Sequence, residues 1–480
     1  MPQVTLESLR TSVFPLILSM RGDLRALGFD RPENWPAFKQ WLLNHGLLEY
    51  PALHDMLLQL AGRSDGALPP SPYPFGVNLV GYAFGELGIG EDVRMAARAL
   101  LAANVPMTLL NFKPGDDIPQ NDHTMAQYVA DDPQYAVNIF CMTAQENGRQ
   151  FLESKAGLYG GRYNIGYWPW ELSGWPKDWE LSFDLVDEIW VSTWHTYQSL
   201  ADISPKPLMH MPMAVDLPEV RRFRSRAAAR KHFKLPASAT LYCFSFDLNS
   251  SIHRKNPQAC VDAFIKAFPK RQYSADQVGL VIKVHTPKEP HPVWDKLKKL
   301  VARDPRIHIV EGTLPKAELL ALYKACDSFL SLHRAEGFGR GIAEALQLGL
   351  HVITTGYSGN VDFCKPPHAE LVNYTLIPIE KGQYPFSDGQ VWADPDINHA
   401  AELMQRFFAQ RQPQAGTTNT AQNPQQPQQP SPAKTSSATI PLAKADWSGF
   451  SGETVGKRYK QRLEQIRTEN PSLFARAESL

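Results

Sequence analysis

Two glutamates late in the sequence, Glu336 and Glu344, enclose three glycines in the segment EGFGRGIAE. The glycines let backbone amides approach a phosphate, because no Cβ stands in the way. A carboxylate in the first turns of the following helix can accept hydrogen bonds from two ribose hydroxyls, as the acidic residue of a dinucleotide site does. A loop followed by a solvated helix residue is the alternative interpretation. The first interpretation predicts that Gly337, Gly339 and Gly341 admit a phosphate, that Glu344 holds a ribose and that Glu336 faces the mouth of a cleft.

A basic pair, Arg254 and Lys255, is the second candidate, because it directly precedes a predicted helix N-terminus. Asn256 suits the N-cap and Pro257 the first helical position. The free N–H groups and the helix dipole at that end favour an anion. Cations there oppose the dipole, a local conflict that is expected where a negatively charged ligand completes the site. An exposed basic pair without function is the equally weighted alternative.

Two further glycine-rich turns follow predicted strands. The first, GELGIG, contains Gly88 and Gly90 and leads into a helix that carries Arg94. Such a turn is by itself a weak indication of a site. The second, GYSGNVDF (356–363), follows the predicted strand HVITT and is expected on the same sheet edge as Glu336.

Other chemistries lack their motifs in this sequence. The glycine-rich segments match neither the G-x-G-x-x-G dinucleotide pattern nor a P-loop. There is no C-x-x-C, H-E-x-x-H or G-x-S-x-G, and the 14 histidines show no ligand spacing. His253 and His285 are interpreted as ordinary loop or core residues, and no metal site is predicted.

Composition sets the class of protein. A chain of 480 residues suits two domains with extensions. Equal numbers of Lys+Arg and Asp+Glu, 49 each, leave no net field to attract nucleic acid. The 5 cysteines are scattered through apolar segments and indicate reduced core thiols. No apolar stretch reaches the roughly 18 residues that cross a bilayer, and the charges around VFPLILSM disfavour a signal peptide. We therefore expect a cytoplasmic protein.

Apolar segments alternate with helical patterns from about residue 75 onward, which is typical of doubly wound parallel sheets. The alternation pauses near 216–236 and then resumes. We therefore expect an α/β protein with two Rossmann-like domains facing a cleft, and ligands beyond the carboxyl ends of the strands. The predicted parts are a helical extension (1–70), a first Rossmann-like domain (71–217), a second one (218–409), a Gln/Pro-rich disordered insertion (410–446) and a final helix (447–480).

Two compositional clusters leave alternatives open. Trp168, Trp170, Trp175 and Trp179 could stack on sugar rings, although such a cluster more often belongs to a core. The stretch 221–234 carries 7 Lys or Arg and no acid. It could dock on anionic lipid, but a solvated helix face is the favoured interpretation.

At these residues the chain resembles a known family. The segment EGFGRGIAEAL, with RKNP about eighty residues earlier, resembles the retaining glycosyltransferases of family 4, which have the GT-B fold. The pattern is a Glu, seven residues and a second Glu, which Glu336 and Glu344 fit. The segments YWPWELSGWPKDW and VWADPD resemble a bacterial branch associated with surface polysaccharide assembly. The resemblance covers about residues 75–405 and the last helix from about 447.

The resemblance implies roles for the candidate residues. Glu336 would contact the donor sugar, Glu344 the donor ribose, and Lys255 with Arg254 would neutralise the diphosphate. The first domain would face the acceptor and the second the donor, and the last helix would cross back to brace the first domain. Donor binding would also involve Gly337, Phe338, Gly339, Gly312, Thr313, Ser358, Gly359 and Asn360, and the acceptor side would involve Gly88, Gly90, Arg94, Trp170 and Glu171.

The sequence departs from the family pattern in two places. Many members carry a histidine near the reacting sugar, whereas the comparable stretches here, NIFCMTAQE and GYWPWE, have none. Trp170 or Glu171 would take that place. Many members also carry a basic residue ahead of the phosphate-binding lysine, where this chain has FDLNSS. The phosphate charge would then rest on Arg254 and Lys255 alone.

The prediction is a retaining hexosyltransferase without metal or cofactor, with a nucleotide diphosphate sugar as donor, GDP-mannose being the first candidate. The expected acceptor is a saccharide or a lipid-linked saccharide of bacterial surface polysaccharide synthesis, which allows peripheral contact with the inner face of the membrane. No nucleic acid partner is expected. A non-catalytic nucleotide-sugar-binding or scaffold protein with the same fold is the alternative, and a GT-B phosphorylase or a dinucleotide dehydrogenase fits less well.

Overall fold

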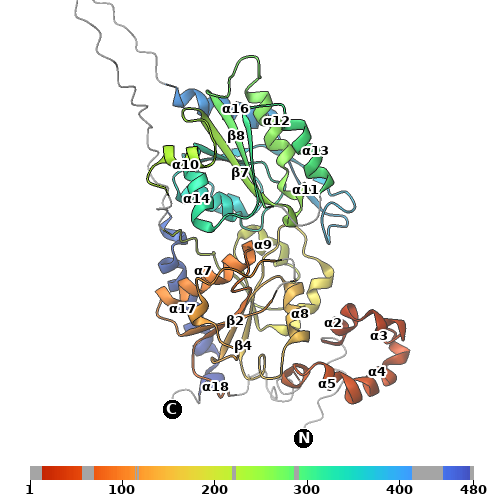
Figure 1. Ribbon diagram of the computed structural model, residues 1–480. Helices are drawn as coiled ribbons and strands as arrows, with labels where there is room; N and C mark the ends of the chain where they lie inside the picture. Colours follow the sequence, from red (N-terminus) through yellow and green to blue (C-terminus); the bar gives the residue numbers. More distant parts are fainter. Residues whose placement is uncertain are drawn as a thin grey trace, which may run out of the picture.

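The structure is a computed structural model that describes residues 13–56, 70–113, 115, 118–218, 223–285, 291–412 and 447–475. In this part of the chain, two parallel sheets of six strands each form two bodies stacked one above the other (Figure 1). This confirms the predicted pair of Rossmann-like sheets. Most of the Gln/Pro-rich segment predicted over 410–446 lies outside the described residues, and its first residues, through Arg411, continue a helix.

The first sheet has the strand order β2-β1-β3-β4-β5-β6, with all neighbours parallel. Its strands are β1 (Val77–Gly81), β2 (Met107–Asn111), β3 (Val137–Cys141), β4 (Tyr163–Tyr167), β5 (Glu188–Val191) and β6 (Leu208–His210). Its helices are α7 (Gly88–Ala102), α8 (Ala144–Glu153), η4 (Lys177–Leu185) and α9 (Trp194–Leu200). Strands buried on both faces need apolar residues at most positions. The polar residues that these strands do carry are paired, as Asn78, Asn138 and Asn164 are by side-chain hydrogen bonds of 2.8 Å between neighbouring strands.

The second sheet has the order β12-β11-β10-β7-β8-β9. Its strands are β7 (Thr240–Asp247), β8 (Val278–His285), β9 (Ile307–Glu311), β10 (Ser328–Ser331), β11 (His351–Thr355) and β12 (Ala369–Val372). Its helices are α10 (Arg226–His232), α11 (Ile252–Lys255), α12 (Pro257–Ala267), α13 (Pro292–Val301), α14 (Lys316–Ala325), α15 (Arg340–Gln347) and α16 (Ile397–Arg411), and β13 (Tyr374–Pro378) pairs with β14 (Val391–Pro395) in an antiparallel hairpin. The sequence analysis missed β6, β12 and this hairpin, which are short or exposed and so lack an apolar run.

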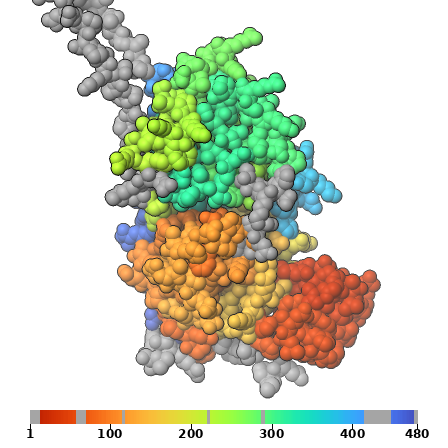
Figure 2. Space-filling model, viewed as in Figure 1, coloured from red at the N-terminus to blue at the C-terminus, as the bar shows by residue number. Residues whose placement is uncertain are grey.

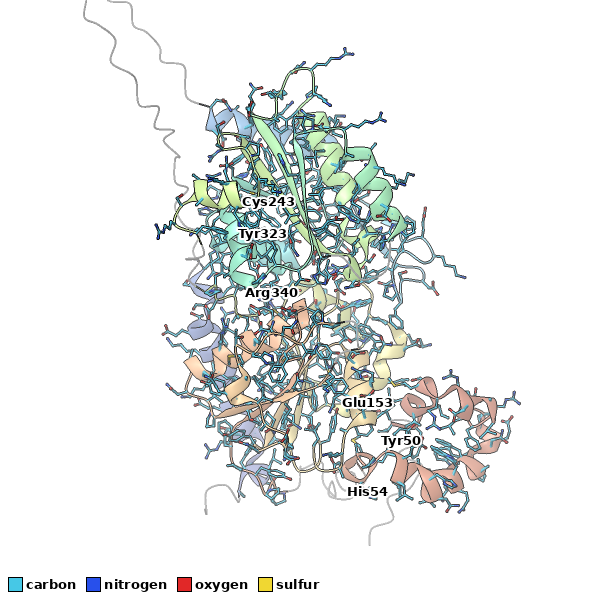
Figure 3. All side chains as sticks on the ribbon, viewed as in Figure 1. Tyr50, His54, Glu153, Cys243, Tyr323 and Arg340 are labelled. Carbon is cyan, nitrogen blue, oxygen red and sulfur yellow. The ribbon has the colours of Figure 1, made fainter. Side chains whose placement is uncertain are left out.

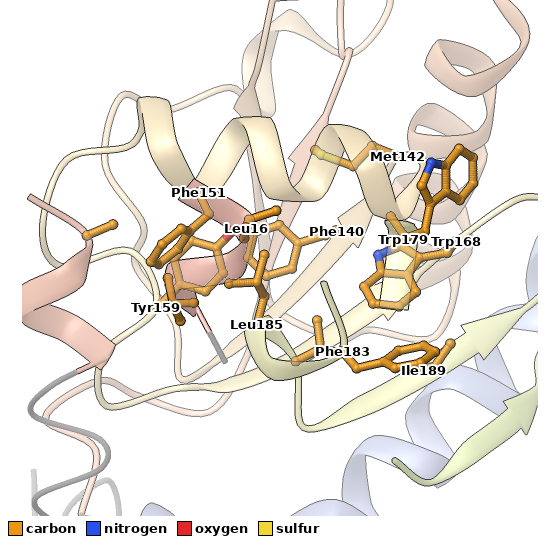
Figure 4. Close-up of a cluster of buried hydrophobic side chains, with 14 of the residues drawn as sticks. Leu16, Phe140, Met142, Phe151, Tyr159, Trp168, Trp179, Phe183, Leu185 and Ile189 are labelled. Carbon is orange, nitrogen blue, oxygen red and sulfur yellow. The ribbon is translucent and has the colours of Figure 1, made fainter. Parts of the chain in front are cut away.

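The N-terminal extension is a separate lobe on one side of the first domain (Figure 2). Its helices are α2 (Val13–Met20), α3 (Gly22–Ala26), α4 (Trp35–Trp41) and α5 (Leu47–Glu49). Leu16 enters the same buried cluster as Phe151 and Leu185 of the first domain (Figure 4). Asp55 accepts hydrogen bonds from the Gly157 and Tyr159 amides at 2.7 and 3.1 Å. The lobe is therefore fixed to the first domain by apolar burial and by a buried carboxylate.

The final helix, α17 (Gly452–Glu469), returns to the first domain and packs along α7 (Figure 1). Its apolar face, which includes Tyr459 and Ile466, belongs to the core of that domain. A Cβ on Gly456 would lie 2.0 Å from the Ala99 carbonyl oxygen, so the two helices touch through their backbones here. The predicted brace from the C-terminus to the first domain is therefore present.

The basic stretch at 221–234 has two kinds of residue. Lys231 and Lys234 are exposed, as a solvated helix face requires, and residues 221 and 222 lie outside the described residues. Arg230, however, is buried, and its guanidinium lies 2.9 Å from the Asp327 carboxylate. Arg226 also pairs with Asp327. Part of the predicted solvated face is thus an internal ion-pair cluster of the second domain.

Replacing Arg462 with alanine will destabilise the first domain by about 3 kcal/mol, because it leaves the fully buried Glu188 carboxylate without its cation. Arg462 Nη2 lies 2.5 Å from Glu188 Oε2. Urea unfolding followed by tryptophan fluorescence measures the loss. Lys457→Ala, which removes an exposed pair with Glu453 on the same helix, is the control and should leave the stability nearly unchanged. Equal effects of the two variants would contradict the prediction.

Candidate active site

Glu336 lies between two cations at the carboxyl end of the second sheet. The loop after β10 carries its carboxylate to 2.5 Å from Lys255 Nζ and 3.1 Å from Arg254 Nη1. Arg254 Nη1 also donates to the Ala335 carbonyl oxygen at 2.9 Å. The Nε of Arg254 is buried and has no hydrogen-bond acceptor among the described residues. The cluster therefore combines a satisfied carboxylate with a cation that keeps one donor free.

Burial and charge act in opposite directions on this cluster. Burial raises the pKa of Glu336, but Lys255 and Arg254 outweigh it and bring that pKa down to about 2. Burial lowers the pKa of Lys255 below its usual value, although Glu336 opposes the shift. At neutral pH the Glu336 carboxylate is ionised, whereas the Lys255 ammonium is easier to deprotonate than an ordinary lysine.

The helix predicted directly after the basic pair is present, since α12 begins at Pro257 with Asn256 as its N-cap residue. Arg254 and Lys255 themselves end a further short helix, α11, which was not predicted. Asn256 follows in the left-handed conformation (φ 50°), and its side chain makes no capping bond to α12. Its amide instead donates to the Leu332 carbonyl oxygen at 3.1 Å. Asn256 therefore joins the basic pair to the strand end that carries Glu336.

Gly337 lies at the contact between the two domains. A Cβ on Gly337 would lie 2.8 Å from the Trp170 carbonyl oxygen of the first domain. Thr193 of the first domain donates its hydroxyl to the Gly337 carbonyl oxygen at 2.8 Å. A Cβ on Gly359 would in turn lie 2.0 Å from that same oxygen. Two of the predicted donor-binding glycines thus bring three backbone segments together.

The other residues of this loop shape the start of α15. Gly339 has φ +91°, in the left-handed region where glycine is strongly favoured, and α15 begins at the next residue. Phe338 is buried against Phe363 and Phe450. Ser358 accepts the Glu336 amide at 2.8 Å. These contacts fix the direction of the helix whose first turns carry Glu344.

His333 is a neighbour of Glu336 that the sequence analysis did not single out. Its Nε2 lies 3.0 Å from Asn360 Oδ1, and Asn360 also donates to the Thr355 carbonyl oxygen at 2.9 Å. Burial lowers the pKa of His333 to about 4, so the ring is neutral at pH 7. Its position three residues before Glu336 is the only sequence signal that could have identified it. The predicted role of Asn360 therefore includes orienting a buried histidine.

Glu344 is buried on α15 and forms an ion pair with Lys316 at the start of α14. Lys316 Nζ also lies 3.8 Å from Glu91 of the first domain. Lys316 was not predicted, although it follows the strand end where Gly312 and Thr313 were expected to take part in donor binding. Thr313 Oγ1 lies 2.9 Å from His285 Nδ1 there. A ribose that binds Glu344 must therefore compete with an ammonium group.

On the first domain, the Gly88–Gly90 loop leads into α7. Arg94 is buried and donates to the carbonyl oxygens of Ala83 and Gly85 at 3.0 and 2.9 Å. It also pairs with Glu91 at 3.0 Å and with Asp122 at 3.1 Å. Its guanidinium therefore supports the loop, whereas the acceptor-side role predicted for it requires a group that faces the cleft.

Trp170 and Glu171 lie opposite Arg254. All four clustered tryptophans are buried, so the core interpretation of that cluster is confirmed. The Glu171 carboxylate accepts the Tyr384 hydroxyl at 2.9 Å and lies 3.7 Å from Arg254. His195 Nε2 lies 2.8 Å from the Glu171 carbonyl oxygen, and burial lowers the pKa of that histidine. The first domain thus supplies a histidine beside Glu171, 24 residues after Glu171 and outside both stretches in which it was sought.

A small pocket opens between α7 and the strand ends of the first sheet. It is lined by Ile89, Asp92, Cys141, Tyr167, Trp168, Pro169, Ser192 and Met213. Asp92 Oδ1 accepts Arg340 Nε across the cleft at 3.0 Å. Arg340 lies where the two domains meet (Figure 3). The carboxyl ends of both sheets therefore converge on one cleft, with Glu336 and Glu344 on one side and the α7 carboxylates on the other.

Comparisons with known proteins agree with this geometry. Residues 250–378 match the family model described as glycosyl transferases group 1. The fold resembles that of sucrose-phosphate synthase from Thermosynechococcus elongatus, with 14% identity, 84% of this chain and 99% of that chain covered, and a TM-score of 0.50. It also resembles HepE of Anabaena, solved with UDP and glucose, with 11% identity, 82% and 100% covered, and a TM-score of 0.50. A glycosyltransferase from Rickettsia africae gives 10% identity, 82% and 98% covered, and a TM-score of 0.51. No curated protein matches the chain.

Two facing Rossmann-like sheets with a C-terminal helix that returns to the first domain define the GT-B class of glycosyltransferases. Within that class, the match over residues 250–378, which include Lys255, Glu336 and Glu344, identifies this part of the chain as that of a group 1 glycosyltransferase. Among the described residues, no helix is both long and apolar enough to cross a membrane.

Affinity for a nucleoside diphosphate will fall as the pH rises from neutral toward 10.5, the usual pKa of lysine. The reason is that burial lowers the pKa of Lys255, so the ammonium loses its proton at a lower pH than an ordinary lysine does and then no longer attracts phosphate. Lys255→Arg should keep its affinity constant over the range, because a guanidinium stays protonated. Isothermal titration at each pH measures both proteins, and a flat wild-type profile would contradict the prediction.

Proposed function

We propose that this glycosyltransferase moves a hexose from a nucleotide diphosphate sugar onto a saccharide or lipid-linked saccharide of bacterial surface polysaccharide synthesis. GDP-mannose is the first candidate donor. The observation that supports a donor site is the cluster in which Glu336 lies against Lys255 and Arg254. Helix α15, which carries Glu344, begins four residues after Glu336. A diphosphate and two sets of hydroxyls require these groups, namely cations for the phosphates and carboxylates for the ribose and the hexose.

Arg254 and Lys255 would stabilise the leaving diphosphate as negative charge develops on it. Arg254 Nε, which is buried without an acceptor, offers a hydrogen bond that a phosphate oxygen can accept. Glu336 would then exchange part of its contact with Lys255 for hydroxyls of the donor sugar. Glu344 would bind the ribose hydroxyls after Lys316 moves away from it.

Retention of configuration follows from attack on the face that the phosphate leaves. The bond between the sugar C1 and the phosphate oxygen breaks, a bond from C1 to the acceptor oxygen forms, and the acceptor proton passes to the leaving phosphate oxygen. The contacts of Gly337 with Trp170 and Thr193 hold the domains together over the site, which limits access of water and therefore hydrolysis of the donor.

The acceptor side of the proposal uses the first domain. The loop at Gly88 and Gly90 and the residues Trp170 and Glu171 border the cleft opposite the donor cluster. In this proposal the first domain spans 71–217, the second spans 218–409 and the extension spans 1–70. A site supplied with nucleotide sugars and a lipid-linked acceptor would work in the cytoplasm, at the inner face of the membrane.

The nucleotide base of the donor is the first property to be determined by experiment. HepE, whose fold is similar, was solved with UDP, so UDP sugars are tested beside GDP-mannose. A non-catalytic nucleotide-sugar-binding protein is the second candidate function, because Glu344 and Glu336 are both paired with lysines in the cleft without donor.

In a thermal-shift screen against GDP, UDP, ADP and dTDP sugars, we expect the sugars of one base to raise the melting temperature of the protein. A ligand at a hundred times its Kd stabilises a protein by about 2.7 kcal/mol, which such a screen detects. Glu344→Ala and Lys255→Ala should lose the shift, whereas Lys457→Ala on the distant helix α17 should keep it. No shift with any donor would contradict the proposed donor site.

Turnover separates the two candidate functions. Incubation of the stabilising donor with a lipid-linked saccharide extract should release the nucleoside diphosphate and form a product with the anomeric configuration of the donor, which NMR measures. Binding without release of diphosphate would favour the non-catalytic candidate.

A further inference from the structure

Arg340 is a cation in an unfavourable place. It is the first residue of α15, where the helix dipole disfavours positive charge. Its Nε donates to Asp92 Oδ1 of α7 at 3.0 Å, and its Nη2 contacts the same oxygen. The two side chains are only 14% and 16% exposed, and they come from different domains. Burial raises the pKa of Asp92 even though Arg340 opposes the shift, so the ion pair holds a carboxylate that is costly to desolvate.

Arg340 lies between Glu336 and Glu344 in the chain, at the first residue of α15. Arg340 and Glu344 are separated by one helical turn on α15 and therefore share a face. Glu336 lies four residues before Arg340, at the strand end. In the proposed function Glu336 contacts the hexose and Glu344 the ribose. The diphosphate joins these two parts of the donor, so it must pass along the stretch of α15 at which Arg340 lies.

The basic pair of the proposed diphosphate site is already partly neutralised by a carboxylate. Arg254 and Lys255 both contact Glu336. The segment FDLNSS, which precedes this pair, contributes no cation and contains Asp247. A donor that brings at least two negative charges therefore needs a further cation from another element. Arg340 is the guanidinium that faces this part of the cleft from α15.

We propose that Arg340 is a third diphosphate-binding residue, held by Asp92 in the cleft without nucleotide and transferred to a phosphate when the donor binds. The inference rests on the proposed function and names a residue that the family pattern does not assign. An arginine fork matches phosphate oxygens in a bidentate manner, as it matches a carboxylate, so the exchange keeps the number of charge-assisted hydrogen bonds. Asp92 competes with the phosphate for the same guanidinium.

This competition predicts opposite effects from the two partners. Arg340→Ala should weaken binding of the nucleoside diphosphate by about tenfold or more, which corresponds to about 1.4 kcal/mol per factor of ten. Asp92→Asn should strengthen it several-fold, because the guanidinium is then free before the donor arrives. The double variant should behave as Arg340→Ala does. Isothermal titration with GDP, UDP, ADP and dTDP, each beside its nucleoside, measures these changes, and binding of the nucleoside should not change in any variant.

The controls keep the result interpretable. Arg226→Ala removes another arginine–aspartate contact of the second domain, at Asp327 and away from the cleft, and should leave diphosphate affinity unchanged. If wild-type protein binds a diphosphate and Arg340→Ala binds it equally well, the inference is overturned while the proposed function stands. If Arg340→Ala and Asp92→Asn weaken binding to the same extent, the pair only joins the domains, and the inference is also overturned. If the wild type binds none of the four diphosphates, the proposed function itself fails.

Discussion

The buried carboxylate of Glu336 is the constraint on which the site depends. A charge removed from water must have partners, or its desolvation cost exceeds what the fold can supply. The partners come from α11, more than eighty residues earlier, and they reach Glu336 because β7 and β10 are parallel neighbours in one sheet. Both strands therefore deliver their carboxyl ends to the same edge. The ion pair consequently requires the sheet order, and the sheet order places the cations at the proposed diphosphate site.

The same loop determines how the two domains meet. Gly337 has no room for a side chain because the Trp170 backbone lies against it, and its carbonyl oxygen accepts the Thr193 hydroxyl. The loop of the proposed donor site is thus also the loop that touches the first domain. On the opposite edge, α17 joins the first domain through its apolar face and through the Arg462–Glu188 pair. The domains are therefore held together at two separate places, at the Gly337 loop beside the candidate site and at α17 far from it.

Charge pairs cross the cleft or line it, and a donor bound at the proposed site would exchange contacts with them. Lys316 binds Glu344 and lies near Glu91, and Arg340 binds Asp92. Each pair satisfies a group that would otherwise be buried without a partner. Nucleotide binding in such a cleft is an exchange of partners, and its net free energy is the difference between two sets of charge-assisted contacts. Affinity is for that reason sensitive to residues that contact other side chains instead of the ligand.

Much of the fold and part of the candidate site could be predicted from the sequence. The buried strands are mostly apolar because parallel sheets are covered on both faces. Glu336 and Glu344 stand in one local motif, and Arg254 and Lys255 stand in another. Asn256 is the N-cap residue of α12 and Pro257 its first residue, as predicted, but the Asn256 side chain makes no capping bond, since its amide is used by a strand end far away in sequence. The short strands and the β13–β14 hairpin were missed because an exposed strand carries no apolar pattern.

The sequence by itself determined which residue types are candidates for the chemistry and that they follow the carboxyl ends of predicted strands. Only the tertiary structure decided their partners. Lys316 reaches Glu344 over 28 positions and Arg340 reaches Asp92 over 248, while His195 comes to Glu171 from the next helix. The physical reason is that a motif is set by neighbours along the chain, whereas an ion pair is set by the packing of elements whose separation in sequence carries no information about their distance.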